Sequence, residues 1–320
     1  MQKIKELMTA YSKAYYNGNP IVSNEEYDAL ERIHGQIISG VGEIPHAYRM
    51  YSLKKHYDRD GALPIGDYVK SEKLDGAAAD LTYVNGKLTI ALTRGDGIKG
   101  RDITDKVRTL NVPPTIPKQG IVQITGEIVA HKDMENSRNY ASGALNQKDM
   151  KVWQEKRTEG DMEFIAYNVQ VVQNLWGLEL TYKDDLITLH NWGFSTASTN
   201  DEFSWSDIYP TDGIVYRLNS NVGFNRLGFT DRFPRGAFAY KEEAEAVSTK
   251  LMEVIWQTGK SGKVTPVGIL EPIVIGEATI SRATLNNIAY IEALDLEIGC
   301  TVQVIRSGEI IPKIIGRIYD

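Results

Sequence analysis

Five short motifs, in order along the chain, combine charged side chains with glycines and could together act on phosphates. They are Lys73-Leu74-Asp75-Gly76, Thr93-Arg94-Gly95-Asp96-Gly97, Gly126-Glu127-Ile128, Asp212-Gly213-Ile214-Val215-Tyr216-Arg217 and Ala237-Phe238-Ala239-Tyr240-Lys241. A deprotonated lysine is a nucleophile, arginine binds phosphate oxygens through paired N–H groups, and carboxylates bind Mg²⁺. Glycines allow tight turns and a close backbone approach to a ligand. Singly, each motif fits an ordinary turn or strand end, so only the ordered set predicts a site.

In this order the motifs resemble those of covalent nucleotidyltransferases, enzymes that attach a nucleotide to a lysine. Longer stretches resemble the bacterial-type NAD-dependent DNA ligases in particular, and the resemblance covers nearly the whole chain. These stretches are Thr93–Thr104, Asn136–Leu145, Gly228–Lys241, Val264–Pro266, Leu270–Pro272, Ser281–Asn287 and Ile311–Lys313. The resemblance implies a DNA ligase that attaches AMP from NAD to Lys73 and releases NMN. AMP then passes to the 5′-phosphate of a nick, and the 3′-hydroxyl seals the strand.

The resemblance also implies roles for single residues. The expected catalytic set is Lys73 as nucleophile, Asp75 and Glu127 as carboxylates that hold ribose, lysine or Mg²⁺, and Arg94, Arg217 and Lys241 as cations around the phosphates. Adenine is expected in an apolar slot, stacked on the ring of Tyr167. The other residues matched to cofactor-binding positions are Ser52, Leu53, Glu72, Leu74, Arg138 and Val215.

The N-terminal residues bear on the choice of cofactor. Tyr15-Tyr16 and the stretch 23–28 resemble a small helical domain found only in the NAD-dependent enzymes, where it holds the NMN half of NAD. Aromatic rings can stack on nicotinamide, and acidic side chains can bind ribose hydroxyls or the charged ring. The cofactor candidates in this region are Tyr15, Tyr16, Asn24, Tyr27 and Asp28.

Several positions depart from the family's pattern. Arg217 stands where the fourth motif usually ends in lysine. Ser71 stands where a glutamate usually lies two residues before the nucleophile, while Glu72 lies one residue before it. The other departures are Asn24, Asn146 and Gly236, in place of an aspartate, an arginine and a tryptophan. These changes indicate a divergent enzyme, such as one encoded by a phage.

Two other functions compete with this prediction. One is an ATP-dependent or RNA ligase of the same superfamily, against which the tyrosine-bearing N-terminal helices argue. The other is a catalytically silent scaffold that binds nucleic acid. The presence of Lys73, Glu127 and Lys241 favours an enzyme over a scaffold.

The elements that would position these motifs form an α+β pattern. Two helices are expected in residues 1–40, and Ser23 and Glu26 have the capping-box spacing that begins the second helix. From about residue 65, strands and helices mix without βαβ alternation, which predicts antiparallel sheets. Asn85-Gly86 predicts a type I′ hairpin. We place the nucleotidyltransferase domain at 41–243, between a helical domain at 1–40 and a barrel at 244–320.

The C-terminal part alternates short strands with Gly and Pro turns, which predicts an OB-fold barrel. We expect nicked double-stranded DNA as the partner, with Lys260, Lys263 and Arg282 on its phosphates. Residues 250–320 hold seven Lys/Arg and eight Asp/Glu, a net charge of −1. The family that the chain resembles normally continues past the barrel into a zinc module, helix-hairpin-helix repeats and a BRCT domain. The resemblance therefore implies a minimal ligase, a trimmed chain, or one subunit of a split enzyme whose second subunit carries those zinc-finger, helix-hairpin-helix or BRCT modules, and the weak charge of the barrel favours the split enzyme.

The composition is that of an ordinary intracellular enzyme. The 320 residues carry a net charge of −6, and 42% are hydrophobic. With Cys300 as the one cysteine and five scattered histidines, the chain lacks the ligands of a zinc site, so no protein-built metal site is predicted. No apolar run has the length of a membrane span, so we expect a cytoplasmic location, in the host cytoplasm if a phage encodes the protein.

Overall fold

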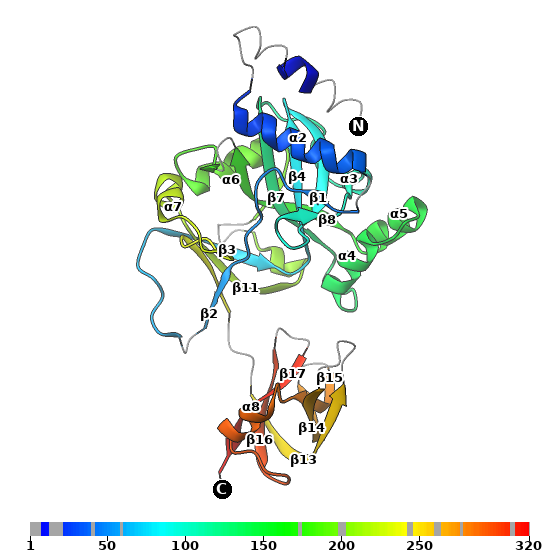
Figure 1. The fold of residues 1–320 in the computed structure, drawn as a ribbon, viewed down its shortest axis with the longest axis vertical. Coiled ribbons are helices and arrows are strands. Elements are labelled where there is room, and N and C mark those ends of the chain that lie inside the picture. Colours follow the sequence, from blue (N-terminus) through cyan, green and yellow to red (C-terminus); the bar gives the residue numbers. More distant parts are fainter. Residues whose placement is uncertain are drawn as a thin grey trace. The chain divides into compact units, whose positions relative to one another are not determined.

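The larger of two units consists of two large β-sheets, a short two-stranded sheet and the helices around them (Figure 1). The units are Met1–Lys241 and Glu242–Asp320. This computed structural model describes residues 8–12, 22–39, 42–57, 60–171, 175–197, 203–241, 246–258, 264–275, 278–307 and 311–319. The predicted α+β class is confirmed. Within those ranges, no helix is long and apolar enough to cross a membrane.

The first sheet has the strand order β10-β8-β7-β4-β5, and β9 pairs with β8. Its strands are β4 (Ala77–Val84), β5 (Lys87–Thr93), β7 (Ile121–Val129), β8 (Glu163–Val171), β9 (Leu175–Trp176) and β10 (Ser195–Thr196). The central pairings are antiparallel as predicted, whereas β10 joins the edge in parallel. The predicted hairpin is confirmed, because Asn85 and Gly86 have φ values of 48° and 75°, as a type I′ turn requires.

The second sheet has the order β2-β12-β11-β3. Its strands are β2 (Lys54–His56), β3 (Tyr68–Leu74), β11 (Thr211–Leu218) and β12 (Ala237–Tyr240). β11 runs antiparallel to both β3 and β12, so Thr211 pairs with Leu74 and Ile214 pairs with Tyr240. The end of β3, the start of β11 and the end of β12 therefore meet, and three of the five motifs lie together.

Helix α2 (Asn24–Ser39) packs on the first sheet. The predicted capping box is confirmed: the Ser23 N–H donates to Glu26 Oε2 over 3.0 Å, and the Glu26 N–H donates to Ser23 Oγ over 3.2 Å. Ala29, Leu30 and Ile33 are buried against side chains of β4, β5 and β7 and of the segment around β1 (Ile44–Pro45). Through these contacts α2 joins the same compact unit as the sheets.

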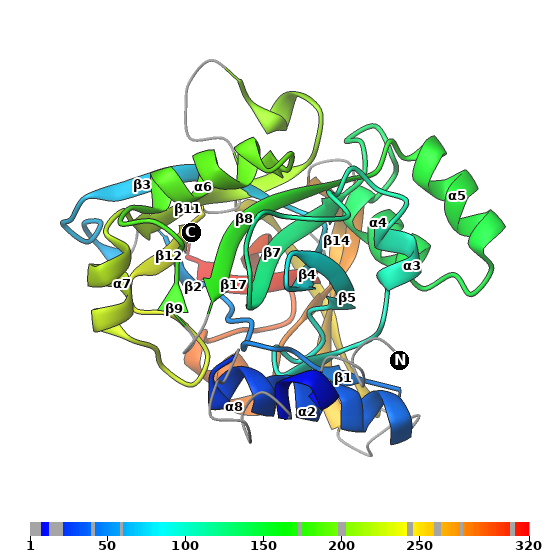
Figure 2. The same cartoon turned by 90° about the horizontal axis from the view of Figure 1, so that it is seen from above.

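Further helices lie around the two large sheets (Figure 2). They are α3 (Thr104–Val107), α4 (Ser137–Leu145), α5 (Met150–Glu159), α6 (Tyr182–Asn191), α7 (Asn221–Leu227) and the 3₁₀ helix η3 (Trp205–Asp207). The largest core cluster includes Trp153, Phe164 and Phe194, each at most 2% exposed. Burying each such side chain contributes about 1.5–3 kcal/mol, which keeps the sheet rigid beneath the site.

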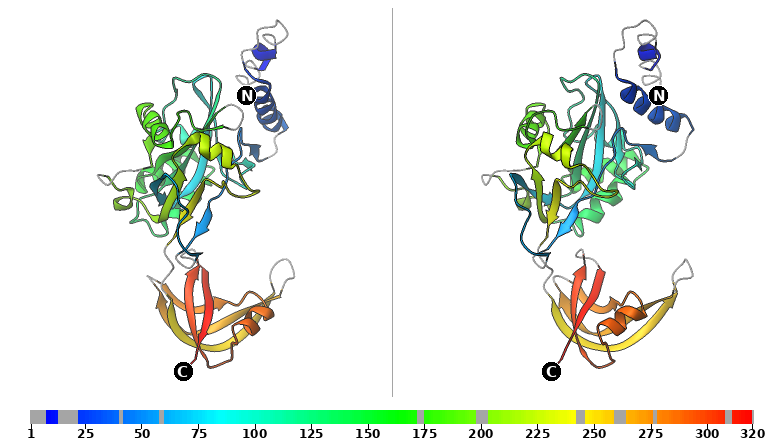
Figure 3. Two further views of the ribbon diagram at one scale, coloured as in Figure 1. Left: turned by 90° about the vertical axis from the view of Figure 1, so that its left-hand side faces the viewer. Right: turned by 60° about the vertical axis from the view of Figure 1, so that its left-hand side comes forward.

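The second unit is a closed barrel with the order β13-β14-β15-β17-β16 (Figure 3). Its elements are β13 (Val247–Thr258), β14 (Val264–Ile275), β15 (Ala278–Thr284), α8 (Ile288–Ala293), β16 (Thr301–Ser307) and β17 (Ile311–Ile318). Leu251, Leu270, Val302, Val304 and Ile314 fill its core at 0–2% exposure. The predicted barrel is confirmed.

Candidate active site

The Lys73 side chain lies at the end of β3 and faces Asp212, near the start of β11. Lys73 Nζ donates a hydrogen bond to Asp212 Oδ1 over 2.6 Å, and the Asp212 side chain is only 9% exposed. Lys241, directly after β12, forms an ion pair with Asp212 Oδ2. Burial alone raises the pKa of Asp212, but Lys73 and Lys241 outweigh burial and lower it. The ionised carboxylate therefore holds two ammonium groups side by side.

Two glycines permit this arrangement. A Cβ on Gly76 would lie 2.3 Å from the Ile128 carbonyl oxygen, so only glycine lets the loop after Lys73 lie against β7. Gly213 has φ +139°, and a Cβ there would lie 2.3 Å from the Tyr240 carbonyl oxygen. Both glycines bring a charged neighbour close to another strand, which explains why Asp-Gly recurs in these motifs.

Asp75 is part of the loop that follows Lys73, and Glu127 on β7 contacts the same loop. Arg138 Nη1 donates to Asp75 Oδ1 over 3.0 Å, and burial raises the pKa of Asp75 despite this partner. The Gly76 N–H donates to Glu127 Oε1 over 3.3 Å. Burial raises the pKa of Glu127 to about 7, although the charges of Lys73 and Arg94 oppose the rise. Glu127 is therefore poised to exchange a proton near neutral pH.

Arg94 and Tyr167 lie close enough to Glu127 for their charges to interact. Arg94 is exposed in the turn after β5, and its charge lowers the pKa of both Glu127 and Tyr167. Tyr167 lies on β8 at the irregularity in the β7–β8 pairing between Thr125 and Gly126. Burial and the Glu127 charge raise the pKa of Tyr167 above its usual range. Its role in stacking on adenine stays a prediction.

Val215, Ser52 and Leu53 lie on strands or segments next to the lysine cluster. Val215 pairs with Ser71 across β11 and β3, and alternation places Ser71 on the same face of β3 as Lys73. Ser52 is exposed, and its N–H donates to the Arg232 carbonyl over 3.2 Å. Leu53 is half-buried and immediately precedes β2, the neighbour of β12.

Glu72 and Leu74 alternate with Lys73 and so lie on the opposite face of β3. The Glu72 carboxylate accepts hydrogen bonds from Ser204 Oγ at 2.6 Å and from the N–H groups of Trp205 and Ser206 at 2.6 and 3.2 Å. Glu72 thus anchors η3. Leu74 is buried in a core cluster with Val129, Ile165 and Tyr209. Both were predicted at adenosine, and those roles stay predictions.

Arg217 lies in a buried polar network away from the lysine cluster. Its guanidinium carbon is 4.2 Å from the ring centre of Tyr182 and 4.1 Å from that of Phe224. Nη2 donates to Asn221 Oδ1 over 2.8 Å, and Asn221 donates to Asp185. Arg217 opposes Val69, four residues and about 13 Å along β3 from Lys73. Its expected contact with phosphate stays a prediction.

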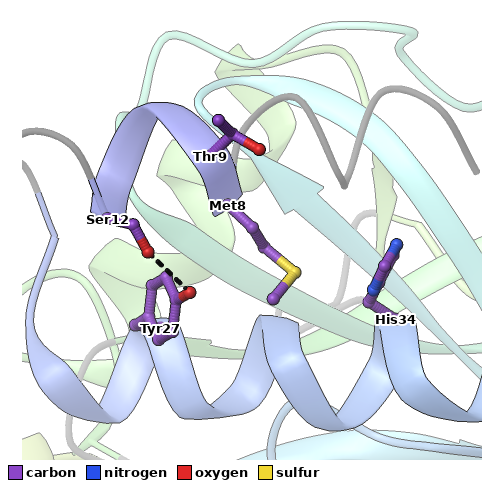
Figure 4. Close-up of a pocket in the computed structure, with 5 residues that line it drawn as sticks. All are labelled: Met8, Thr9, Ser12, Tyr27 and His34. Atoms are coloured by element: carbon purple, nitrogen blue, oxygen red, sulfur yellow. Dashed lines mark hydrogen bonds between the residues drawn. The ribbon is translucent and has the colours of Figure 1, made fainter.

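The N-terminal cofactor candidates are described only in part. Tyr15 and Tyr16 lie outside the described residues; Asn24 begins α2, and Asp28 on α2 is exposed. The Tyr27 hydroxyl is 2.8 Å from Ser12 Oγ. Figure 4 shows this contact at a pocket of about 290 Å³ lined by Met8, Thr9, Ser12, Tyr27 and His34. The contact places Tyr27 beside a cavity, whereas its role toward NMN stays a prediction.

Of the predicted DNA contacts, only Arg282 is described. It is exposed on β15, opposite Ile269 of β14, whereas Lys260 and Lys263 lie outside the described residues. The described residues contain no group of three or more His, Cys, Asp or Glu that could hold a metal ion.

Sequence reasoning did not assign a role to Asp212, although the Asp212-Gly213 motif contains it. Three more residues went unnoticed because no motif marks them. Tyr182 donates to the Tyr167 carbonyl over 2.8 Å, and His46 and Asp80 form a buried pair under the Arg94 turn. Asp80 could have been noticed as a carboxylate in an otherwise apolar strand.

Two lysines that share a carboxylate at the edge of one sheet, followed by a closed barrel, are the arrangement expected of the covalent nucleotidyltransferases. Two family models then match the chain: the NAD-dependent DNA ligase adenylation domain over residues 39–245, and the NAD-dependent DNA ligase OB-fold domain over residues 248–320. The chain therefore belongs to the NAD-dependent DNA ligase family.

Curated relatives agree with this assignment, and a solved structure shares the fold. The chain is 32% identical to a DNA ligase of Alkaliphilus oremlandii (strain OhILAs), an alignment that covers 100% of this chain and 57% of the relative. It is also 32% identical to a DNA ligase of Campylobacter concisus (strain 13826), covering 98% and 57%. The chain thus spans a little over half the length of these relatives. A structure from a study of Lig E DNA ligases shares the fold, with a TM-score of 0.51, 14% identity, and coverage of 84% of this chain and 98% of that one.

Proposed function

We propose that this chain adenylylates Lys73 from NAD and uses the adenylate to seal nicks in double-stranded DNA. The observation that carries the proposal is the cluster in which Asp212 holds Lys73 beside Lys241. A structural ion pair needs only one lysine. A lysine nucleophile that attacks a phosphate benefits from a fixed orientation, which Asp212 would give Lys73, and from an adjacent cation, which Lys241 would supply.

The first step forms a bond between Lys73 Nζ and the adenylyl phosphorus, while the bond from phosphorus to the NMN phosphate oxygen breaks. Nζ must first lose a proton. Asp212 orients Nζ but keeps a proton poorly, because its pKa is lowered. Glu127, with a pKa of about 7 and charge coupling to Lys73, is the better acceptor.

The remaining charges would stabilise the phosphates. Lys241 and Lys73 bind the two oxygens of the Asp212 carboxylate, and the half-exposed Arg138 binds Asp75. We include Mg²⁺, and Asp75 is the candidate to hold it, because it is the other carboxylate near Lys73 and leaves Glu127 able to accept the proton. The described residues build no three-ligand metal cluster, so phosphate oxygens would complete the coordination. Bound there, Mg²⁺ would supply charge neutralisation.

The N-terminal helical region would hold the NMN half of NAD. Support comes from the half-buried Tyr27 at the pocket in Figure 4, next to the exposed Asp28. An aromatic ring and a carboxylate suit a positively charged nicotinamide ring. The same residues would not be needed if ATP were the nucleotide donor.

A mass measurement after incubation with NAD and a magnesium salt tests the first step. We expect an increase equal to one AMP, and no increase for Lys73→Ala. Lys70→Ala is the matched control, because Lys70 is an exposed lysine of the same strand. AMP transfer from ATP but not from NAD would favour the alternative ligase class, and no adduct from either donor would favour a silent scaffold.

A nick-sealing assay tests the later steps. We propose duplex DNA as the partner, supported by the barrel and by family membership. The net charge of −1 over residues 250–320 supports a further proposal, that a second chain with zinc-finger, helix-hairpin-helix or BRCT modules assists binding. Sealing by the purified chain at the rate of AMP transfer would refute the need for that partner.

A further inference from the structure

A buried histidine–aspartate pair lies under the Arg94 turn and takes no part in the steps above. The side chains of His46 and Asp80 are both 0% exposed. His46 Nδ1 contacts Asp80 Oδ2, and His46 Nε2 lies 2.9 Å from the Arg94 carbonyl oxygen. Thr82 Oγ1 donates to the other Asp80 oxygen over 3.3 Å. A buried ionisable pair is costly to keep unless its hydrogen bonds are satisfied, so these contacts define its protonation.

The two contacts of the ring fix the number of protons that the pair must hold. A carbonyl oxygen only accepts, so His46 Nε2 must carry a hydrogen toward Arg94. A second proton must lie between Nδ1 and Asp80, because otherwise a nitrogen lone pair would face a carboxylate. The pair is thus either imidazolium with carboxylate or imidazole with carboxylic acid. Loss of the second proton would leave the lone pair of His46 Nδ1 facing the ionised Asp80 carboxylate, and the two would repel each other.

The same histidine joins the segment after β1 to the turn that carries Arg94. The His46 N–H donates to the Ile98 carbonyl over 3.0 Å, and the Met50 N–H donates to the Gly97 carbonyl over 2.9 Å. The Gly97 N–H closes the turn onto the Arg94 carbonyl over 2.9 Å. The Arg94 carbonyl therefore accepts from the turn itself and from His46. The His46 ring thus holds the backbone of the residue whose charge acts on Glu127.

We propose that His46, held by Asp80, is a positioning residue that orients Arg94 for adenylyl transfer. The inference rests on the proposed function only in its use of Arg94 during that step. A role in folding alone would also bury such a pair, but it would not depend on the Arg94 side chain. The two roles therefore differ in a way that can be measured.

Arg94 gives the first test, through a double-mutant cycle. His46→Asn keeps a side-chain N–H for Asp80 and removes the donor to the Arg94 carbonyl. We expect about a tenfold lower rate of AMP attachment at saturating NAD, with little change in KM for NAD, and no further loss when His46→Asn is added to Arg94→Ala. Equal losses in both backgrounds would overturn the proposal, since they would show that His46 acts without Arg94.

Asp80→Asn gives the second test and does not depend on the first variant being stable. An asparagine N–H can donate to His46 Nδ1 while Nε2 still donates to the Arg94 carbonyl. Both contacts of the ring then persist with a neutral imidazole, and neither depends on a proton that is lost as the pH rises. Burial lowers the pKa of His46, but Asp80, with help from the Arg94 carbonyl and the Asp96 charge, raises it overall. The quantity to follow is the rate of AMP attachment by Asp80→Asn divided by the rate for the unchanged chain. This ratio should increase as the pH is raised beyond 6.5, the ordinary pKa of histidine, because only the unchanged chain loses the proton. A ratio independent of pH would contradict the proposal.

Two controls separate this inference from the proposed function. His190→Gln alters an exposed histidine on α6 and should leave the pH profile unchanged. Nitrogen NMR of the histidine rings needs no activity: His46 Nε2 should carry hydrogen at neutral pH, and the pair should lose its second proton only above pH 6.5. No AMP adduct in any variant would refute the proposed function alone. A His46 ring whose Nε2 carries no hydrogen at pH 6 would refute the inference alone, because it could not donate to the Arg94 carbonyl oxygen.

Discussion

Asp212 determines whether two lysines can lie side by side at the edge of the second sheet. Lys73 and Lys241 were predictable from the ordered set of five motifs and the family that this set resembles. Their shared partner was not, since Asp212 is 139 positions from Lys73 and meets it only through the pairing of β11 with β3. Removing its charge would leave two ammonium groups with mutual repulsion and no carboxylate between them.

Glu127 carries the pH dependence that can be predicted at this scale. Its pKa is raised to about 7 from an ordinary 4.5, chiefly by burial. The protonated form is therefore favoured in the folded chain, and the stability it contributes is present below pH 4.5 and is lost as pH rises through 7. We expect Glu127→Gln to be more stable than the unchanged chain above pH 7, yet to attach AMP about 100-fold more slowly. Thermal unfolding at pH 5 and pH 8 measures the first effect; equal differences at both would contradict it.

At the scale of elements, close approach of the loop after Lys73 to β7 requires a glycine. Gly76→Ala should destabilise the fold by about 1–3 kcal/mol and slow AMP attachment, because its Cβ would meet the Ile128 carbonyl at 2.3 Å. Gly143→Ala is the matched control: this glycine is inside α4, with nothing within 4 Å of the added carbon. That variant should be stabilised by about 0.5–1 kcal/mol. A shift of the same sign in both melting temperatures would show that the close approach does not matter.

Arg217 ties β11 to α6 and α7 through the two aromatic rings and Asn221. Burial lowers its pKa to about 10, so it stays charged at neutral pH. Arg217→Lys places the family's expected residue there, but an ammonium cannot match the planar stacking or the paired donors. We expect a loss of about 1–3 kcal/mol in the free energy of unfolding and no faster AMP attachment. Arg226→Lys, at an exposed position of α7, should change neither. A faster rate with unchanged stability would restore the phosphate role.

Sequence patterns within a few residues predicted individual helices and turns, but they did not predict how the strands assemble into sheets. The capping box at Ser23 and the hairpin at Asn85 depend on neighbouring residues, so sequence sufficed. The division of strands between two sheets and the parallel edge strands β2 and β10 depend on contacts between distant residues. The contact of Glu72 with η3 likewise joins residues that are far apart in the sequence, so no local signal indicated it.

For the whole molecule, the division at Lys241 separates two tasks. Every group proposed for AMP attachment lies in Met1–Lys241, and the barrel begins after it. A chain shortened to residues 1–246 should therefore still acquire AMP on Lys73, with Lys241 retained, but should seal no nicks above background, since the barrel proposed to bind DNA is missing. Mass measurement and a nick-sealing assay on the same preparation separate the two results, and thermal unfolding confirms that the shortened chain is folded. If the folded short chain sealed nicks as fast as the full chain, the barrel would not be the DNA-binding unit.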